Sequence, residues 1–445
     1  MDYQFNITTY LVEILSTYLD TQQIWIAYSG GLDSQVLLHA VAQLRPQLPQ
    51  QKLRAIHIHH GLHSQADYWA QHCQASCQAL AIPCEIIHVQ VRQAPRESLE
   101  ANARTARYQA IAQLLAPKDI VLTAQHTDDQ AETVLLQLFR GAGVAGLAAM
   151  PMVTRLALGW LIRPLLNYTR AQLYAYAQQA QLQWIEDSSN TDIRFDRNFL
   201  RHQIIPQLQQ RWPSLSQTLN RSARHQAEAH ELVQDLAQID WETCRTNHLT
   251  QLNLEALATL RPARQRQVIR YWLNQCQLPI PSSAQLQQLL HNFLSAKTDR
   301  QPVISWRGLE IRRYRQLLFA MPPLPPQPAA SYQLTWLLPQ LLILPLGQLT
   351  AVPVLGQGLA LPSGTVLQIR FRQGGEVFHW HGHQRVVKKL LQTLQLPPWQ
   401  RYFIPLVYLN TTLVAIPYIG VQDELKAQTG QMGWEIQWQF FAKDS

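Results

Sequence analysis

Residues 24–34, with the apolar run 35–41 behind them, constrain the fold of this chain more than any other stretch. The first five residues, Ile-Trp-Ile-Ala-Tyr, are apolar and mostly β-favouring, which predicts a short buried strand. Ser29, Gly30 and Gly31 predict a tight turn, because two adjacent glycines allow positive φ and let backbone N–H groups approach an anion. A helix beginning directly after them would add unpaired N–H donors and the positive end of its dipole. The stretch therefore predicts a phosphate-binding turn between a strand and a helix.

This turn lacks the Gly-Lys-Ser/Thr ending of the Walker motif. Asp33 stands at its rim instead, where it would repel phosphate unless a cation lies between them. Mg²⁺ fits this position, because proteins usually hold it with few carboxylates plus phosphates. A strand-to-helix turn with two convenient glycines is the alternative. The residues expected to hold the nucleotide are Ser29, Gly30, Gly31, Leu32, Asp33 and Ser34, with Asp33 as the metal ligand.

Strand-like and helix-like segments alternate over the first half of the chain, which predicts an α/β fold with a doubly wound parallel sheet. Ligands of such sheets bind beyond the carboxyl ends of the strands, so segments that follow strands should converge on one crevice. The expected strands are 24–28, 53–60, 85–91 and 119–124, and the expected helices are 1–20, a helix opened by a capping box at Ser64–Asp67, 98–115, and one capped by Thr127. A second capping box, Thr169–Gln172, predicts a further helix start.

The segment 126–133, His-Thr-Asp-Asp-Gln-Ala-Glu-Thr, is the second chemical motif. On a helix, Asp129 and Glu132 share one face because they are three residues apart. Two carboxylates at the mouth of a nucleotide crevice require a cation between them, either Mg²⁺ or the ammonium of an amine substrate. The alternative is acidic residues that complement the helix dipole. His126 is expected to contact substrate beside them.

The sequence predicts the roles of other polar side chains less specifically. Arg104 and Arg107 share a helix face and could bind phosphate or carboxylate, although a solvated face would look the same. Four histidines follow the second strand, and hydrogen bonding at the strand end is favoured for them over metal ligation; they are His57, His59, His60 and His63. The glycine-rich segment 141–150 reads as a hinge, a closing loop or a simple helix end.

The composition bounds the class of protein. A chain of 445 residues predicts two or three domains, and its formal charge of +8 favours a polyanionic partner, with a basic enzyme that binds no nucleic acid as the alternative. Five scattered cysteines predict reduced thiols and a cytoplasmic location. The N-terminus lacks the pattern of a signal peptide, and the apolar run 334–346 is short and broken by Pro339, so no membrane span is expected.

The second half predicts additional domains. The expected division is 1–215, a nucleotide-binding catalytic domain; 216–320, a helical domain; 321–332, a proline-rich linker; and 333–445, a small α+β domain. Basic side chains interleaved with aromatics in these parts suit RNA contact, and a solvated surface is the alternative. They are Arg264, Arg266, Arg270, Arg370, Arg372, Arg385, Lys388 and Lys389.

An ordered set of motifs resembles the tRNA(Ile)-lysidine synthase family, whose members use a pyrophosphate loop of the form SGGxDS within an adenine nucleotide alpha hydrolase-like fold. The matching motifs are SGGLDS at 29–34, HHGL at 59–62, HTDDQAET at 126–133, GAGVAGLAAM at 141–150, RPL at 163–165, EDSSN at 186–190 and RNFLRHQIIPQL at 197–208. They cover the first 215 residues, and residues 333–445 are similar to the C-terminal domain of the longer members.

The resemblance implies a ligase that uses ATP and Mg²⁺ to adenylate C2 of the wobble cytidine in the CAU-anticodon isoleucine tRNA, followed by attack of free L-lysine. It implies Asp33, Asp129 and Glu132 as catalytic residues, with lysine or phosphate held by Arg104, Arg107, His126, Asp129 and Glu132. The expected assembly is a homodimer. A tRNA thiolase, a small-molecule synthetase sharing the loop, and a nucleotide- or RNA-binding protein without turnover remain alternatives.

Overall fold

The computed structural model describes residues 7–18, 20–61, 63–91, 99–187, 191–295 and 302–441. Parts of the predicted segments 1–20, 59–62, 98–115, 186–190, 216–320 and 333–445 lie outside these ranges, namely residues 1–6, Leu19, Leu62, Ser98, 188–190, 296–301 and 442–445. The chain divides into two compact units, 1–233 and 234–445, and the division falls within the long helix α10, Leu215–Cys244.

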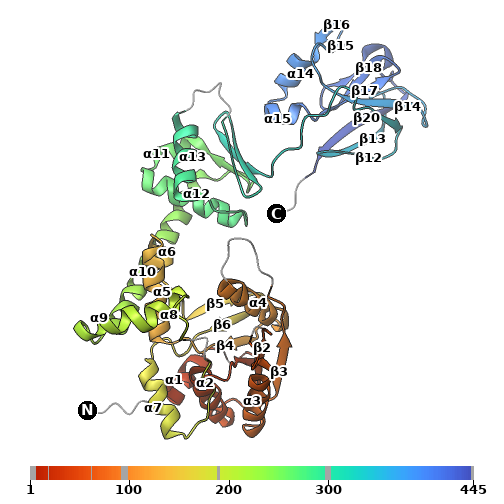
Figure 1. The fold of residues 1–445 in the computed structure, drawn as a ribbon. Coiled ribbons are helices and arrows are strands. Elements are labelled where there is room, and N and C mark those ends of the chain that lie inside the picture. The colour runs from red at the N-terminus through yellow and green to blue at the C-terminus, as the bar shows by residue number, and fades with distance from the viewer. Residues whose placement is uncertain are drawn as a thin grey trace. The chain divides into compact units, whose positions relative to one another are not determined.

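The first unit contains a six-stranded sheet in the order β3-β2-β1-β4-β6-β5 (Figure 1). Its first four strands in this order and β6 run parallel, while β5 pairs antiparallel with β6. Chain order reverses between β1 and β4, and ligands of doubly wound sheets bind beyond the carboxyl ends of the strands at such a point. The predicted α/β fold class is confirmed. The strands are β1 Gln23–Ala27, β2 Lys52–His59, β3 Cys84–His88, β4 Ile120–Leu122, β5 Val153–Leu156 and β6 Gly159–Ile162.

Helices cover both faces of this sheet (Figure 1). Both helices expected after residues 64 and 126 are present, but their predicted caps are wrong: Gln65 precedes α3 without a side-chain capping bond, and His126, not Thr127, caps α5. The capping box at Thr169 is confirmed. The helices are α1 Ile7–Ser16, α2 Leu32–Gln43, η1 Arg45–Gln47, α3 Ala66–Ala79, α4 Leu99–Leu114, α5 Thr127–Phe139, α6 Val144–Leu147, α7 Arg170–Gln179, α8 Asp196–Phe199, the π-helical turn η3 Leu200–Ile204, α9 Ile205–Arg211 and α10.

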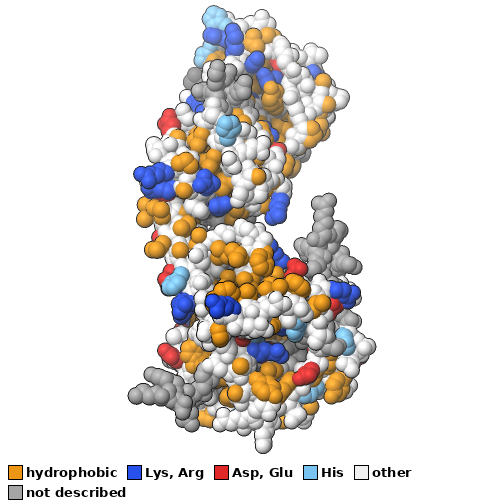
Figure 2. Space-filling view, turned by 60° about the vertical axis from the view of Figure 1, so that its left-hand side comes forward, with side chains coloured by type: hydrophobic (Ala, Val, Ile, Leu, Met, Phe, Trp, Pro, Cys, Tyr) orange, Lys and Arg blue, Asp and Glu red, His pale blue; other side chains and the backbone are white. Residues whose placement is uncertain are grey.

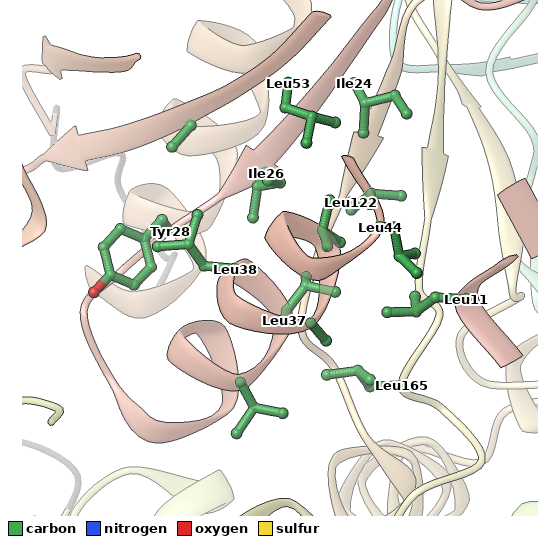
Figure 3. Close-up of a cluster of buried hydrophobic side chains, with 14 of the residues drawn as sticks. Leu11, Ile24, Ile26, Tyr28, Leu37, Leu38, Leu44, Leu53, Leu122 and Leu165 are labelled. Carbon is green, nitrogen blue, oxygen red and sulfur yellow. The ribbon is translucent and has the colours of Figure 1, made fainter. Parts of the chain in front are cut away.

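The sheet is buried because its strands carry apolar side chains on both faces. Ile24 and Ile26 of β1 pack with α1, α2 and α7, and Figure 3 shows Leu11 and Leu37 beside them. Trp25 points to the other face and packs with Ile111 of α4. Each such buried side chain stabilises the fold by ~1.5–3 kcal/mol. The two cores fix α2 and α4 on opposite faces, so the turn before α2 and the N-terminal part of α4 approach the crevice from different sides.

The second unit begins with a mixed segment. Its helices agree with the expectation for 216–320, but four antiparallel strands, in the order β7-β10-β9-β8, add a sheet that was not predicted. The glycine turn at Arg307-Gly308, with φ of 44° and 77°, closes β8 onto β9. The elements are β7 Gln251–Asn253, α11 Leu254–Thr259, α12 Pro262–Gln275, α13 Ser283–Ser295, β8 Val303–Trp306, β9 Leu309–Tyr314 and β10 Leu317–Met321.

The chain is irregular between Met321 and Leu334, and the rest is a β-rich body with two short helices. Its core gathers Trp336, Leu367, Ile369 and Phe378. The elements are β11 Leu334–Leu337, β12 Leu342–Leu344, β13 Gly347–Leu355, β14 Val366–Phe371, β15 Val377–Trp380, β16 His383–Val386, α14 Val387–Thr393, α15 Pro398–Arg401, β17 Pro405–Leu409, β18 Thr412–Ile416, β19 Gly420–Val421, η4 Asp423–Leu425 and β20 Met432–Phe440.

Surface charge is dispersed on the face drawn in Figure 2, where Lys and Arg side chains form several small groups separated by uncharged surface. Among the described residues, no helix has the length and apolar character needed to cross a membrane. All five cysteines are described, and all are free thiols.

Candidate active site

The predicted phosphate turn leaves β1 with Gly30 in the left-handed region at φ +85°. A Cβ atom at Gly30 would lie 3.1 Å from both Cys73 Sγ and Ile185 Cδ1, so a side chain here would strain the backbone and crowd two neighbours. The Ile185 amide donates to the Gly30 carbonyl at 2.9 Å. Packing therefore holds the turn close to its neighbours and leaves glycine as the residue that fits.

Two serine hydroxyls brace the turn from within. Ser34 Oγ donates to the Gly31 carbonyl at 2.9 Å and lies 3.1 Å from Ser29 Oγ. Gly31 is the N-cap of α2, and no side chain of the described residues accepts a capping bond there. The first amides of α2, beginning with buried Leu32, therefore remain free to donate to an anion at the positive end of the helix. This geometry suits a phosphate group.

Asp33, the metal ligand predicted from the sequence, stands on the first turn of α2 with its side chain 30% exposed. Its Oδ2 atom lies 3.6 Å from His126 Nε2. Its Oδ1 atom is buried and has no hydrogen-bond partner in the described parts of the chain. An unpaired buried carboxylate oxygen is costly, and a hard cation such as Mg²⁺ would satisfy it. The residues present therefore fit the predicted ion.

His126 joins the two motifs that the sequence singled out. Its Nε2 atom lies 3.4 Å from Asp129 Oδ2 as well as 3.6 Å from Asp33 Oδ2. Its Nδ1 atom accepts a hydrogen bond from the Asp128 amide at 3.2 Å and caps α5. The phosphate turn after β1 and the acidic segment after β4 thus meet at one buried imidazole, as the convergence of strand ends predicts.

The carboxylates around His126 control its charge. Burial alone would lower its pKa, but Asp129, Asp33 and Asp128 outweigh burial and raise the pKa to about 9. When protonated, Nδ1 can no longer accept from the Asp128 amide and has Asp128 Oδ2 at 3.6 Å as its acceptor.

We expect the free energy of unfolding to fall as pH rises from 6.5 to about 9 in protein free of divalent cations. Because the pKa of His126 is higher in the folded than in the unfolded state, the folded protein binds the proton more tightly. The resulting stabilisation is fully present below pH 6.5 and is lost as the pH rises through about 9. Urea unfolding across this range, compared between wild type and His126→Gln, measures the contribution. His39→Gln is the control, because burial lowers the pKa of His39 and its contribution has the opposite sign. Equal pH slopes for wild type and His126→Gln would contradict the assignment.

Glu132 is paired with arginines. Its side chain is 1% exposed, and it accepts from Arg197 Nε at 2.7 Å and from Arg201 Nε at 2.6 Å. Arg201 also reaches Asp129 Oδ1 at 2.9 Å. Burial alone would raise the pKa of Asp129, but His126, Arg197 and Arg201 hold it below its ordinary value. The cation between the two carboxylates is therefore a pair of guanidinium groups, rather than the Mg²⁺ or substrate ammonium considered from sequence.

Arg197 and Arg201 are site residues that the sequence reasoning did not assign a role. They stand on α8 and η3, four residues apart, and Pro206 follows Arg201 by five residues. The Ile205 amide bonds the Leu200 carbonyl five residues back, which is the hydrogen-bond pattern of a π-helix. Two arginines one helical turn apart in the segment 197–208 were the available signal.

Asp128 joins the start of α5 to the neighbouring helices α7 and α10. Its Oδ1 atom accepts from Ser216 Oγ of α10 at 2.7 Å, and its Oδ2 atom accepts from the Arg170 amide at the start of α7 at 2.8 Å. Asn220 of α10 donates to the Leu166 carbonyl at 3.2 Å. These bonds fix the orientation of α5, and with it the positions of His126 and Asp129.

The remaining predicted residues lie along α4 and the end of β2. Arg104 lies over the ring of Tyr108 at 5.2 Å. Burial, assisted by Arg107, lowers the pKa of His60 to about 4. No contact joins Arg104 directly to Asp33, Asp129 or Glu132 among the described residues.

The histidines make local contacts. His57 Nδ1 lies 3.0 Å from the Tyr28 carbonyl, next to the phosphate turn. His59 pairs with Asp67 at 3.0 Å, and the ring of His63 stacks on Trp69. Hydrogen bonding at the strand end, the favoured interpretation, accounts for His57 and His59. The segment 141–150 begins as a helix end, with Gly141 at φ +68° directly after the C-cap of α5, and continues into α6.

Comparisons with known proteins place these motifs in a family. Residues 4–208 match a family model described as a PP-loop domain, residues 252–319 a TilS substrate binding domain, and residues 367–438 a TilS substrate C-terminal domain. A tRNA(Ile)-lysidine synthase of Coxiella burnetii is 40% identical over 432 residues, which cover 96% of this chain and 95% of the relative. One of Serratia proteamaculans is 42% identical over 424 residues, which cover 94% and 95%. At this identity over nearly the whole length of both proteins, the chain belongs to the tRNA(Ile)-lysidine synthase family.

Proposed function

We propose that this chain is an ATP-dependent ligase that forms lysidine on an isoleucine tRNA. The observation that carries the proposal is the meeting of Asp33, from the phosphate turn, and Asp129, from the acidic segment, at His126. A phosphate-binding turn and a carboxylate group beside it are the two parts that base adenylation and amine attack require. Membership of the family supports the same reaction.

The residues present suit each step. The turn at 29–34 would hold the ATP phosphates while the C2 oxygen of the cytidine attacks the α-phosphorus and pyrophosphate leaves, a step that depends on positioning and charge neutralisation. Mg²⁺ held by Asp33 would supply neutralisation of phosphate charge. The target base must leave its stack to reach the crevice, which an anticodon loop permits.

The second step needs an amine-binding site. Asp33, Asp128, Asp129 and Glu132 place four carboxylates against the two guanidinium groups of Arg197 and Arg201, so the cluster retains negative charge for a cation even when His126 is protonated. The oxygens of both carboxylates already accept hydrogen bonds, those of Glu132 from the two arginines and those of Asp129 from Arg201 and the His126 amide. Because the Glu132 side chain is 1% exposed and that of Asp129 is 15% exposed, we assign the lysine ammonium to Asp129. Asp129 could then accept the proton that the amine loses before it attacks C2 and expels AMP.

The proposed macromolecular partner is the CAU-anticodon isoleucine tRNA, and the proposed small substrate is free L-lysine. Support for RNA contact comes from the second unit, where Arg370 stacks on Tyr408 at 4.7 Å and Arg372 on Tyr402 at 4.6 Å. Guanidinium groups held flat on tyrosine present their edges to phosphates. We keep the division at 1–215, 216–320, 321–332 and 333–445, the cytoplasmic location and a homodimer as proposals.

The proposal is tested by mass analysis of CAU-anticodon tRNA incubated with the chain, ATP and L-lysine. We expect one nucleoside to gain the mass of lysine less one water, with AMP and pyrophosphate released in equal amounts. The same tRNA with the wobble cytidine replaced by uridine should gain nothing, because uracil lacks the 4-amino group that makes the C2 oxygen of cytosine nucleophilic enough to be adenylated. Pyrophosphate exchange into ATP that needs no tRNA would point instead to a small-molecule synthetase and overturn the proposal.

A further inference from the structure

Arg163 directly follows β6 at the carboxyl edge of the parallel sheet. Ile162, the last residue of β6, pairs with Leu122, the last residue of β4. The amide of Thr123, which follows Leu122, donates to the Ile162 carbonyl at 3.0 Å. β4 in turn pairs with β1, which leads into the phosphate turn. Neighbouring strands are about 4.8 Å apart, so Arg163 lies within two strand spacings of the end of β1.

The Arg163 side chain is buried with much of its hydrogen-bonding capacity unused. It is 5% exposed, its Nη1 atom donates to the Pro151 carbonyl at 2.8 Å, and it hydrogen-bonds the Tyr108 hydroxyl. Its Nε atom is buried and has no hydrogen-bond partner among the described residues. A guanidinium offers five N–H donors, and the Nε–H is the buried one left without an acceptor.

The charge of Arg163 is also uncompensated among the side chains that the structure describes, which leave out those of residues 99–101 on α4. None of the described carboxylates lies within 4 Å of its guanidinium nitrogens, although buried arginines are normally paired. Arg104, a second cation, acts on it through its charge. Burial and Arg104 both lower the pKa of Arg163, and only Tyr108 opposes them. A buried cation beside a second cation is a costly arrangement, unless an anion occupies the site during function.

We propose that Arg163 and Arg104 form an oxyanion subsite of the active crevice, oriented by Tyr108. The ligand chemistry is a carboxylate or a phosphate, which a guanidinium fork binds through two parallel hydrogen bonds. Two sources on the proposed reaction path carry such a group, the α-carboxylate of lysine and a phosphate of ATP or tRNA. The inference thus rests on the proposed function and adds to it the group that recognises the anionic end of a substrate.

A substrate lacking the carboxylate separates these sources. Lysinamide keeps both amines of lysine but replaces the carboxylate with a neutral amide. For wild type we expect lysine to be preferred over lysinamide in kcat/KM by about 10- to 100-fold, the range for one hydrogen-bonded charge. Arg163→Gln should abolish this preference, Arg163→Lys should restore part of it, and Tyr108→Phe should weaken it less than Arg163→Gln does.

The control is Arg155→Gln. Arg155 lies on the neighbouring β5, exposed and stacked on Trp160 at 4.8 Å, and should leave the preference unchanged. If Arg163→Gln keeps the preference for lysine but raises KM for ATP, or lowers the salt dependence of tRNA binding by about one phosphate contact, the anion is a phosphate. If every parameter matches Arg155→Gln while the melting temperature shows a folded chain, Arg163 only braces the Pro151 segment and the proposal fails.

Failure of the proposed reaction is distinguishable from failure of the subsite. Should wild type form no lysidine, the shift in melting temperature caused by lysine, phosphate or pyrophosphate still reports anion binding without turnover. A shift present in wild type and Arg155→Gln but absent in Arg163→Gln supports the subsite. A shift equal in all three proteins, or absent from all three, contradicts it.

Discussion

Glu132→Gln is expected to lower the free energy of unfolding by about 3–5 kcal/mol and to abolish lysidine formation. The side chain is 1% exposed, and each of its oxygens accepts from an arginine at 2.6–2.7 Å. The substitution keeps the shape of the side chain but removes its charge. Arg197 and Arg201 would then be held in a buried cluster with Asp129 as their remaining carboxylate.

The matched control is Glu85→Gln. Glu85 pairs with Arg54 at 3.1 Å in the same unit, but both side chains are more than a third exposed, at 35% and 37%. Water screens such a pair, and its loss costs less than about 1 kcal/mol. Urea unfolding gives the loss of stability in each of the two variants, and lysine incorporation into tRNA, measured in parallel, gives the loss of activity. A destabilisation of Glu132→Gln no greater than that of Glu85→Gln would show that the buried pairing does not hold the site together.

A double-mutant cycle shows whether the arginines act through Glu132. If Arg201 depends on that carboxylate, Arg201→Gln in the Glu132→Gln background should cost less than in wild type, with a coupling of about 0.5–3 kcal/mol. Arg211, at the end of α9 and exposed, provides the independent partner, because its replacement should add to Glu132→Gln without coupling. Additivity for both arginines would contradict the pairing.

The sequence predicted the parts of the site that are local in the chain. Ser29–Ser34 form a turn whose conformation follows from two glycines and a helix start, and Asp129 and Glu132 share a helix face because of their spacing. Their convergence followed from the rule that ligands bind at the carboxyl ends of parallel strands. Pairing partners could not be predicted in this way. Arg197 and Arg201 reach Glu132 from 65 and 69 residues away.

The sheet in the second unit was missed although the sequence carried a signal for it. Residues Leu309 to Tyr314 alternate buried and partly exposed side chains, and Arg307-Gly308 is a two-residue turn with positive φ at both positions. Such a turn between alternating segments is a strong hairpin indicator. The helical, glutamine-rich sequence before it dominated the interpretation. In contrast, nothing local to residues 163–165 distinguishes a buried unpaired arginine from a surface one, because burial depends on how α4 and β6 pack.

Asp33→Asn is expected to lower ATP–pyrophosphate exchange by about 10²–10³-fold while leaving the fold intact, the typical loss when one charge-stabilising group is removed from a polar active site. The amide is nearly isosteric and can still face His126, but it cannot bind a hard cation as a carboxylate does. Oδ1 of Asp33 is buried and accepts no hydrogen bond from the described residues, so the substitution removes no such bond at this oxygen. Asp33→Asn should therefore lower activity without lowering the free energy of unfolding, whereas Glu132→Gln should lower both.

Asp67→Asn is the matched control, because Asp67 also faces a histidine, His59, at 3.0 Å, but its side chain is 85% exposed and lies on α3. Exchange by this variant should equal that of wild type. Raising the Mg²⁺ concentration should recover part of the exchange of Asp33→Asn, since weaker binding of the ion can be offset by mass action. The decisive measurement is the Mg²⁺ concentration that gives half-maximal exchange in each protein. If Asp33→Asn has the same requirement as wild type and Asp67→Asn, the carboxylate beside the phosphate turn does not bind the metal, and its role must be sought in its contact with His126.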